Sequence, residues 1–120
     1  MLLDDMSKVY DLEDRTEKFA RDCRELIRKL HKDIANVEDG KQLVRSSGSV
    51  AANYIEANEA VSKKDFLHRL KISRKEAKES RLWLRLILTA DEELTKRQTM
   101  LIQESTELIK ILTTIISKSE

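Results

Sequence analysis

Hydrophobic residues recur at spacings of three and four along most of this sequence, the pattern that predicts amphipathic α-helices. The pattern is clearest between residues 66 and 87. One ribbon there faces a core and comprises Phe66, Leu70, Ser73, Ala77, Ser80, Leu84 and Ile87. A second ribbon lies one residue out of phase, which on a helix is a rotation of about 100°. It consists of five cations, here called the basic stripe: Lys71, Arg74, Lys78, Arg81 and Arg85.

The first helix is predicted to begin at Asp11, a good N-cap, and to fade after His31. Its apolar face comprises Leu12, Phe19, Cys23, Leu26, Ile27 and Leu30. Residues 33–40 are predicted to form a polar connection, because Asp39-Gly40 is the clearest break signal in the chain.

The second helix is predicted over residues 41–58, and residues 46–52 at its middle are unusually small. Gly48 would cost about 0.5–1 kcal/mol there relative to alanine, which is tolerable if a neighbouring backbone approaches closely. The alternative is a kink in the second helix at Gly48.

Arg45, Asn53 and Glu56 are polar among small neighbours. We expect a partly buried polar network that fixes helix register, with a binding role as the alternative.

The third and fourth helices have clear start signals. Ser62 and Asp65 form a capping box, which starts a helix that should run to about Thr89. The fourth helix should begin near Asp91, followed by acids that suit the positive end of its dipole, and end near Ser117.

These segments predict an all-α fold, with an up-down-up-down antiparallel four-helix bundle over residues 10–118. Residues 1–9 are expected to be a flexible extension and residues 119–120 a tail. The runner-up is a helical hairpin that completes its bundle only by dimerising.

Composition supports this class, since proline is absent and only two glycines occur, too few turn residues for a β-sandwich or doubly wound fold. The single cysteine, Cys23, shares an apolar face and is expected to be buried. The N-terminus lacks the features of a signal peptide, and no apolar run is long enough for a membrane span. We therefore expect a cytoplasmic protein without a membrane partner.

Charge is distributed unevenly, although the net charge is only +1. Residues 63–90 hold nine basic and three acidic residues, a surplus of six positive charges. Such a block can attract phosphate backbones, or it can pair with acidic helices of its own fold or of a neighbouring subunit.

Residues 82–88 are apolar around most of the helix, more than one intramolecular core can cover. Exposed apolar patches usually mark interfaces, and tryptophan is enriched among interface hot spots. Trp83 is therefore the expected anchor of an oligomer interface, unless it merely borders the core of the monomer. The candidate interface comprises Ile72, Glu76, Glu79, Trp83 and Leu86.

Catalytic and metal-binding patterns are absent from the sequence. It has no glycine-rich phosphate loop, no Cys-x-x-Cys and no His-Glu-x-x-His, and His31 and His68 lie in different segments. We expect no catalytic residue, metal, cofactor or small-molecule substrate, and hence a protein that is not an enzyme.

Four runs are distinctive in sequence and spacing: residues 10–16, 42–57, 62–70 and 75–84. They resemble the four-helix proteins encoded by intervening sequences in bacterial 23S ribosomal RNA genes, sometimes labelled S23 ribosomal protein. The resemblance implies a ring-like homopentamer of four-helix bundles. A related branch, the accessory protein of diversity-generating retroelements, binds nucleic acid and a reverse transcriptase through a basic surface. Family members usually begin just before the first run, so Met6 is an alternative start to Met1.

Two functions follow as hypotheses. In the first, a homo-oligomer binds RNA or DNA through the basic stripe, extended by Lys63 and Lys64. In the second, the protein is a scaffold or protein-interaction module without a nucleic-acid role. The stripe would then pair with Glu76 and Glu79 of a neighbouring subunit in a head-to-tail ring.

Overall fold

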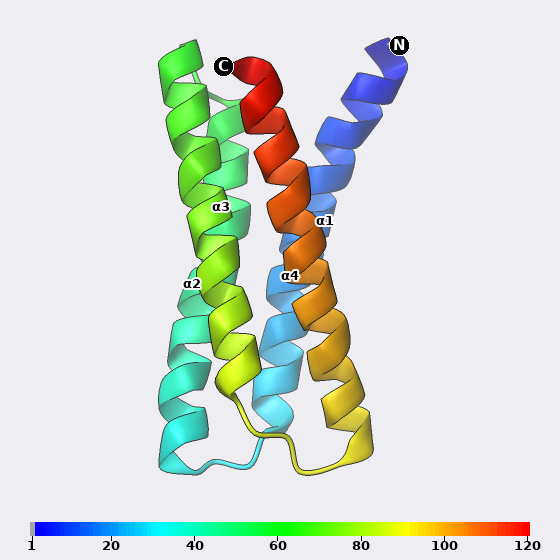
Figure 1. Cartoon of the computed structure of the whole chain (residues 1–120), viewed down its shortest axis with the longest axis vertical. Coiled ribbons are helices and arrows are strands. Elements are labelled where there is room, and N and C mark those ends of the chain that lie inside the picture. The colour runs from blue at the N-terminus through cyan, green and yellow to red at the C-terminus, as the bar shows by residue number, and fades with distance from the viewer. Residues whose placement is uncertain (1) are drawn as a thin grey trace.

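The computed structural model describes the backbone of residues 2–120 and the side chains of residues 12–120. Four helices occupy this range: α1 (Leu2–Lys29), α2 (Ile34–Asn58), α3 (Lys63–Leu86) and α4 (Glu92–Ser119). They lie lengthwise beside one another in an elongated molecule (Figure 1) of 45 × 24 × 19 Å. Residues 2–120 contain no strand, so the predicted all-α, four-helix fold is confirmed.

Each helix packs against two others, in the order α1–α2, α2–α3, α3–α4 and α4–α1, which places α1 diagonally across from α3. Hydrogen bonds fix the register of α2 against α3. Ser80 Oγ donates to Ser46 Oγ at 2.8 Å, and Ser73 Oγ donates to the Val50 carbonyl at 2.8 Å. The partners run in opposite order along the two helices, so α2 and α3 are antiparallel.

Three helices begin at side-chain caps, which satisfy backbone N–H groups that a helix leaves without partners at its N-terminus. Ser62 accepts from the Asp65 N–H at 3.0 Å, and Asp91 accepts from the Leu94 N–H at 2.9 Å. Both starts were predicted from the sequence. The predicted ends are less accurate, because α3 stops at Leu86 rather than near Thr89.

Two predicted boundaries are wrong. Helix α1 begins at Leu2, so Asp11 lies inside it and does not cap it, and much of the predicted extension is helical. Residues 33–40 are not a connection, because Asp33 caps α2 by accepting from the Asn36 N–H at 2.8 Å. Gly40 lies within α2, where a Cβ atom would stand 3.3 Å from Ile27 Cγ2. This glycine serves helix packing instead of a turn.

The core is built from leucines and isoleucines of all four helices around Phe19. The predicted burial of Cys23 is confirmed, since none of its surface is exposed. Burial raises the pKa of the Cys23 thiol to about 12, so the group stays protonated and unreactive at neutral pH.

Gly48 makes room for an arginine. A Cβ atom at Gly48 would stand 3.1 Å from Nη2 of Arg24. The Arg24 guanidinium crosses from α1 to donate to the Val44 carbonyl at 3.2 Å and to Ser47 Oγ at 3.4 Å. Helix α2 runs unbroken through Gly48. The close approach predicted there occurs, but a side chain rather than a backbone makes it.

Asn36 ties together the two connections at one end of the molecule. Its side chain is buried and accepts from the Leu88 N–H at 2.9 Å. Its Nδ2 donates to the Leu88 and His31 carbonyls, each at 3.0 Å. Residues 30–33, which join α1 to α2, are thereby fixed to residues 87–91, which join α3 to α4.

Candidate nucleic-acid interface

The basic stripe lies on the side of α3 that borders α4, and its five members divide into two sets. Lys71, Lys78 and Arg85 are exposed to solvent. Arg74 and Arg81 are half-buried and reach across to α4. Two threonines there accept their hydrogen bonds: Arg74 Nη1 donates to Thr113 Oγ1 at 3.4 Å, and Arg81 Nη1 donates to Thr106 Oγ1 at 3.2 Å.

These two hydrogen bonds restrict the arginines without neutralising them. A threonine hydroxyl carries no charge, so each guanidinium keeps its full positive charge and its other N–H donors. Holding a long side chain in place in advance also reduces the rotamer entropy that binding would otherwise cost. Arg74 and Arg81 are therefore partly preorganised cations along the boundary between α3 and α4.

No acidic side chain forms an ion pair with the stripe among residues 12–120. Two acids in the middle of α4 have other partners. Glu104 binds Arg15 of α1 at 2.7 Å, and Glu107 lies 4.0 Å from Lys110 on its own helix. No acid among the described residues therefore neutralises the positive charge of the stripe.

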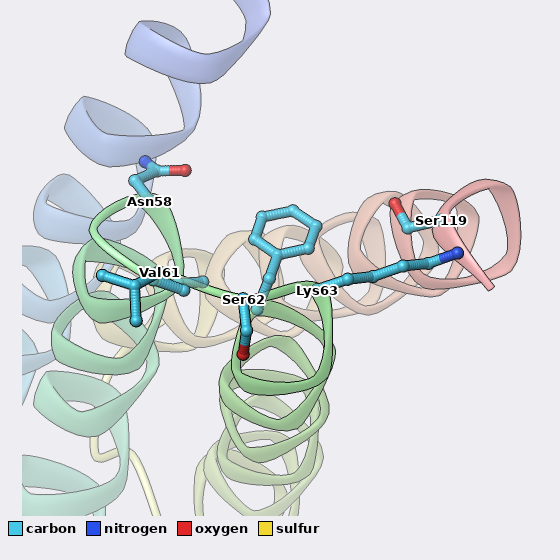
Figure 2. A pocket seen from close by; sticks show the side chains of 8 residues that line it. Asn58, Val61, Ser62, Lys63 and Ser119 are labelled. Carbon is cyan, nitrogen blue, oxygen red and sulfur yellow. The ribbon is translucent and has the colours of Figure 1, made fainter.

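Lys63 and Lys64 lie in the first turn of α3, at the far end of the helix from Arg85, and both are exposed. Lys63 lines an open pocket of about 490 Å³, together with Phe66 and Ser119. Figure 2 shows its side chain extended along α4 toward Ser119, while Asn58 points away toward α1. The two lysines add positive charge at the start of the helix that carries the stripe.

The acids of the candidate oligomer interface are engaged within the chain. Glu76 is only 6% exposed, and its Oε2 lies 3.3 Å from Arg45 Nη1 and 3.4 Å from the Ser49 hydroxyl. Glu79 Oε1 lies 3.6 Å from Arg45 Nη2. Arg45 of α2 therefore neutralises both acids that the scaffold hypothesis assigned to a neighbouring subunit.

The apolar members of that candidate interface are more accessible. Leu86 is half exposed, and Ile72 and Trp83 have intermediate burial. Trp83 packs against the main core cluster. Its indole Nε1 is enclosed, and no hydrogen-bond acceptor for it lies among the described residues. Trp83 thus borders the core of the monomer and also reaches the outer part of α3.

The polar residues predicted on the second helix lie in one network with α3. Arg45 holds Glu76, as described above. Asn53 Nδ2 donates to the Ser49 carbonyl at 2.9 Å, and its Oδ1 accepts from Arg69 Nη1 at 3.5 Å. Arg69 Nη1 also lies 2.8 Å from Glu56 Oε2. The network spans the contact between α2 and α3 and faces away from α4.

Sequence reasoning did not identify the threonines that hold the stripe. Thr106 and Thr113 are seven residues apart on α4, and their partners Arg81 and Arg74 are seven apart on α3. The matching spacing is a signal that an antiparallel pairing of the two helices could have revealed. It becomes informative only once the register between α3 and α4 is known.

Among the described residues, no helix is both long enough and apolar enough to cross a membrane. Residues 12–120 likewise contain no group of three or more His, Cys, Asp or Glu side chains placed to hold a metal ion.

Comparisons with known proteins agree on one family. The sequence profile of the 23S rRNA-intervening sequence proteins matches residues 8–114. A crystal structure of a protein of unknown function from the S23 ribosomal protein family of Bacteroides thetaiotaomicron is 30% identical and has a TM-score of 0.77. The match covers 92% of this chain and 98% of that chain. No curated protein matches the sequence.

Proposed function

The chain belongs to the 23S rRNA-intervening sequence protein family, and from this premise we propose that it is a non-enzymatic protein that binds RNA or DNA. The binding surface is the basic stripe of α3, with Lys63 and Lys64 at its start. The protein is a bacterial, cytoplasmic, up-down-up-down four-helix bundle. It assembles as a ring-like homo-oligomer, a pentamer if it follows the family resemblance.

The observation that supports this proposal is the contrast between the two flanks of α3. On the flank toward α2, Arg45 neutralises Glu76 and Glu79. On the flank toward α4, two of the five cations donate to threonine hydroxyls, and none of the five forms an ion pair with an acid among the described residues. Unpaired cations in a row are what a polyanion needs, because each phosphate that they neutralise releases counterions into solution.

Assembly would strengthen a weak surface. One chain offers only a few phosphate contacts, and each exposed charge pair contributes little at physiological salt. A ring that presents several stripes to one polyanion turns the later contacts into intramolecular events, which raises the overall affinity without any new kind of contact.

Neutralising the exposed cations is expected to weaken nucleic-acid binding at least about tenfold at low salt, and to reduce the salt slope by about 2–3. The test variant is Lys71→Gln/Lys78→Gln/Arg85→Gln, whose side chains are exposed and whose removal should leave the fold intact. Fluorescence anisotropy with labelled RNA and DNA at about 50 mM and about 200 mM salt measures both effects.

The matched control for this test is a triple neutralisation on α1, Lys18→Gln/Arg21→Gln/Lys29→Gln, on the helix diagonally opposite α3. It removes the same charge and should leave most of the affinity. If the wild-type protein fails to bind at low salt, or if the two triple variants lose affinity equally, the proposed function is wrong.

The scaffold function remains the second candidate, because large apolar side chains are exposed at the end of α3 and just beyond it. Leu82, Leu86 and Leu88 are each about half exposed or more. Clustered apolar surface of this kind usually marks a protein interface. On this alternative the oligomer, or a partner protein bound to it, is the functional unit and the stripe has no ligand.

Trp83→Ala is expected to reduce oligomerisation more than it destabilises the monomer, and Leu86→Glu should do the same by placing a charge in the interface. Light scattering measures the assembly, and far-UV circular dichroism reports on the fold. Val61→Glu is the matched control, since Val61 is 98% exposed but lies between α2 and α3 at the opposite end of the molecule. An intact assembly in both test variants would contradict this interface.

A further inference from the structure

We infer that the nucleic acid bound by the basic stripe is a duplex, recognised through its phosphates, and not a single strand. This inference rests on the proposed function and specifies its ligand. It follows from three features of the described residues: the spacing of the exposed cations, the positions of the aromatic side chains, and the continuity of the helix that carries the stripe.

The spacing of the accessible cations is twice that of the stripe as a whole. Members of the stripe recur every three or four residues, about 5 Å along a helix axis. Arg74 and Arg81, however, are half-buried and held by α4. The three exposed members, Lys71, Lys78 and Arg85, are seven residues apart, which places them about 10.5 Å apart along the axis.

That spacing suits the two strands of a duplex. In B-form DNA the phosphate backbones lie on either side of a major groove about 12 Å wide. Long, flexible Lys and Arg side chains that start about 10.5 Å apart can therefore reach phosphates of opposite strands across a groove. Helix α3 is continuous from Lys63 to Leu86, so the cations keep this spacing before the ligand binds.

Single strands are usually held by a different arrangement, in which successive bases stack on aromatic side chains. Here the aromatic residues of the described side chains lie elsewhere. Phe19 and Tyr54 are buried in the core. Phe66 and Trp83 pack against that core, and Trp83 lies on the α3 flank that also carries Glu76 and Glu79. The stripe therefore offers charge and hydrogen-bond donors, with no aromatic side chain of the described residues on which a base could stack.

A surface that depends on charge alone favours the ligand with the greater charge density. Duplex DNA carries one phosphate per about 1.7 Å of axis, compared with about 3.4 Å for each strand, and it releases more counterions per contact. A duplex is also already rigid, whereas a flexible single strand loses conformational freedom when it is fixed along the helix. Without stacking to offset that loss, the single strand should bind more weakly.

The experiment compares three labelled ligands of about 20 nucleotides or base pairs at about 50 mM salt: single-stranded RNA, duplex RNA and duplex DNA. The full chain is titrated into each. Both duplexes should bind about tenfold more tightly than the single strand, because each presents two phosphate backbones. Duplex DNA should be the tighter of the two, because the spacing of the exposed cations suits its major groove and the major groove of duplex RNA is narrower. Lys78→Gln should weaken duplex binding more than Arg21→Gln, its matched control on α1.

The outcomes separate this inference from the proposed function. Equal or tighter binding of the single strand overturns the duplex inference and leaves nucleic-acid binding intact. More than about 100-fold discrimination between duplex RNA and duplex DNA would also overturn it, because phosphates alone cannot distinguish the two to that extent. If none of the three ligands binds, the proposed function itself fails.

Discussion

Replacing Asn36 with alanine is expected to lower the free energy of unfolding by about 2–4 kcal/mol. The substitution removes three hydrogen bonds at once, two to the backbone of Leu88 and one to the carbonyl of His31. Asn36 is only 4% exposed, whereas Leu88 is 71% exposed, so water can replace part of what the Asn36 side chain provides to these backbone groups. Each buried polar group left unsatisfied costs about 1–3 kcal/mol, and partial relaxation of the connections limits the sum.

Urea denaturation followed by far-UV circular dichroism measures this loss. Gln42→Ala is the matched control, because Gln42 is an exposed amide on the same helix and its removal should change stability by less than about 0.5 kcal/mol. A loss below about 1 kcal/mol for Asn36→Ala would mean that the two connections hold their positions without this side chain.

Asn36 also illustrates where sequence reasoning fails for this fold. The sequence reads Asp39-Gly40 as a break, because such pairs favour turns locally. In the structure, α2 continues through both residues. Asn36, in the first turn of α2, is hydrogen-bonded to Leu88, which is 52 residues away in the sequence, and Gly40 packs on Ile27. Both contacts are tertiary, and a local pattern carries no information about them.

The helix starts at Ser62 and Asp91, in contrast, were predictable because they depend on local contacts. A cap is a contact between residues three positions apart, so the sequence contains all of it. The same holds for the core ribbon of α3, where the predicted residues from Leu70 to Leu84 are buried. Helical periodicity alone determines which of these positions share a face.

The candidate site was predictable only in outline. Periodicity placed the five cations in one line, but it could not distinguish the exposed members from Arg74 and Arg81. That distinction depends on the register between α3 and α4, which brings Thr113 and Thr106 to the two arginines. Likewise, from the sequence Glu76 was expected to pair with a neighbouring subunit, whereas the packing of α2 on α3 places Arg45 of the same chain beside it.

Removing the positive charge of Arg45 is expected to lower the free energy of unfolding by about 1–3 kcal/mol. In Arg45→Met, Glu76 would remain buried with only the Ser49 hydroxyl beside its carboxylate. Breaking a fully buried ion pair costs about 3–5 kcal/mol. The smaller figure reflects the Arg45 side chain, which is 52% exposed, so that water replaces part of what the guanidinium provides.

A double variant separates the cost of the isolated charge from the value of the pair. Arg45→Met/Glu76→Met removes both charges and keeps the volume of the side chains, so it should recover most of the stability lost in Arg45→Met. Glu79→Ala is the control, because its ion pair with Arg45 is longer, at 3.6 Å, and more exposed. Its effect should stay within about 0.5 kcal/mol.

The same measurement bears on the choice between the two functions. If Glu76 depends on Arg45 of its own chain, it is not available to the basic stripe of a neighbouring subunit, and the stripe is left for a polyanion. The alternative result is that Arg45→Met lowers the free energy of unfolding of the diluted monomer but not that of the assembled protein. A cation of a neighbouring subunit would then neutralise Glu76 in the oligomer. Comparing denaturation of the variant at high and low protein concentration distinguishes these results, because stability gained from association depends on concentration. We expect the loss to be the same at both.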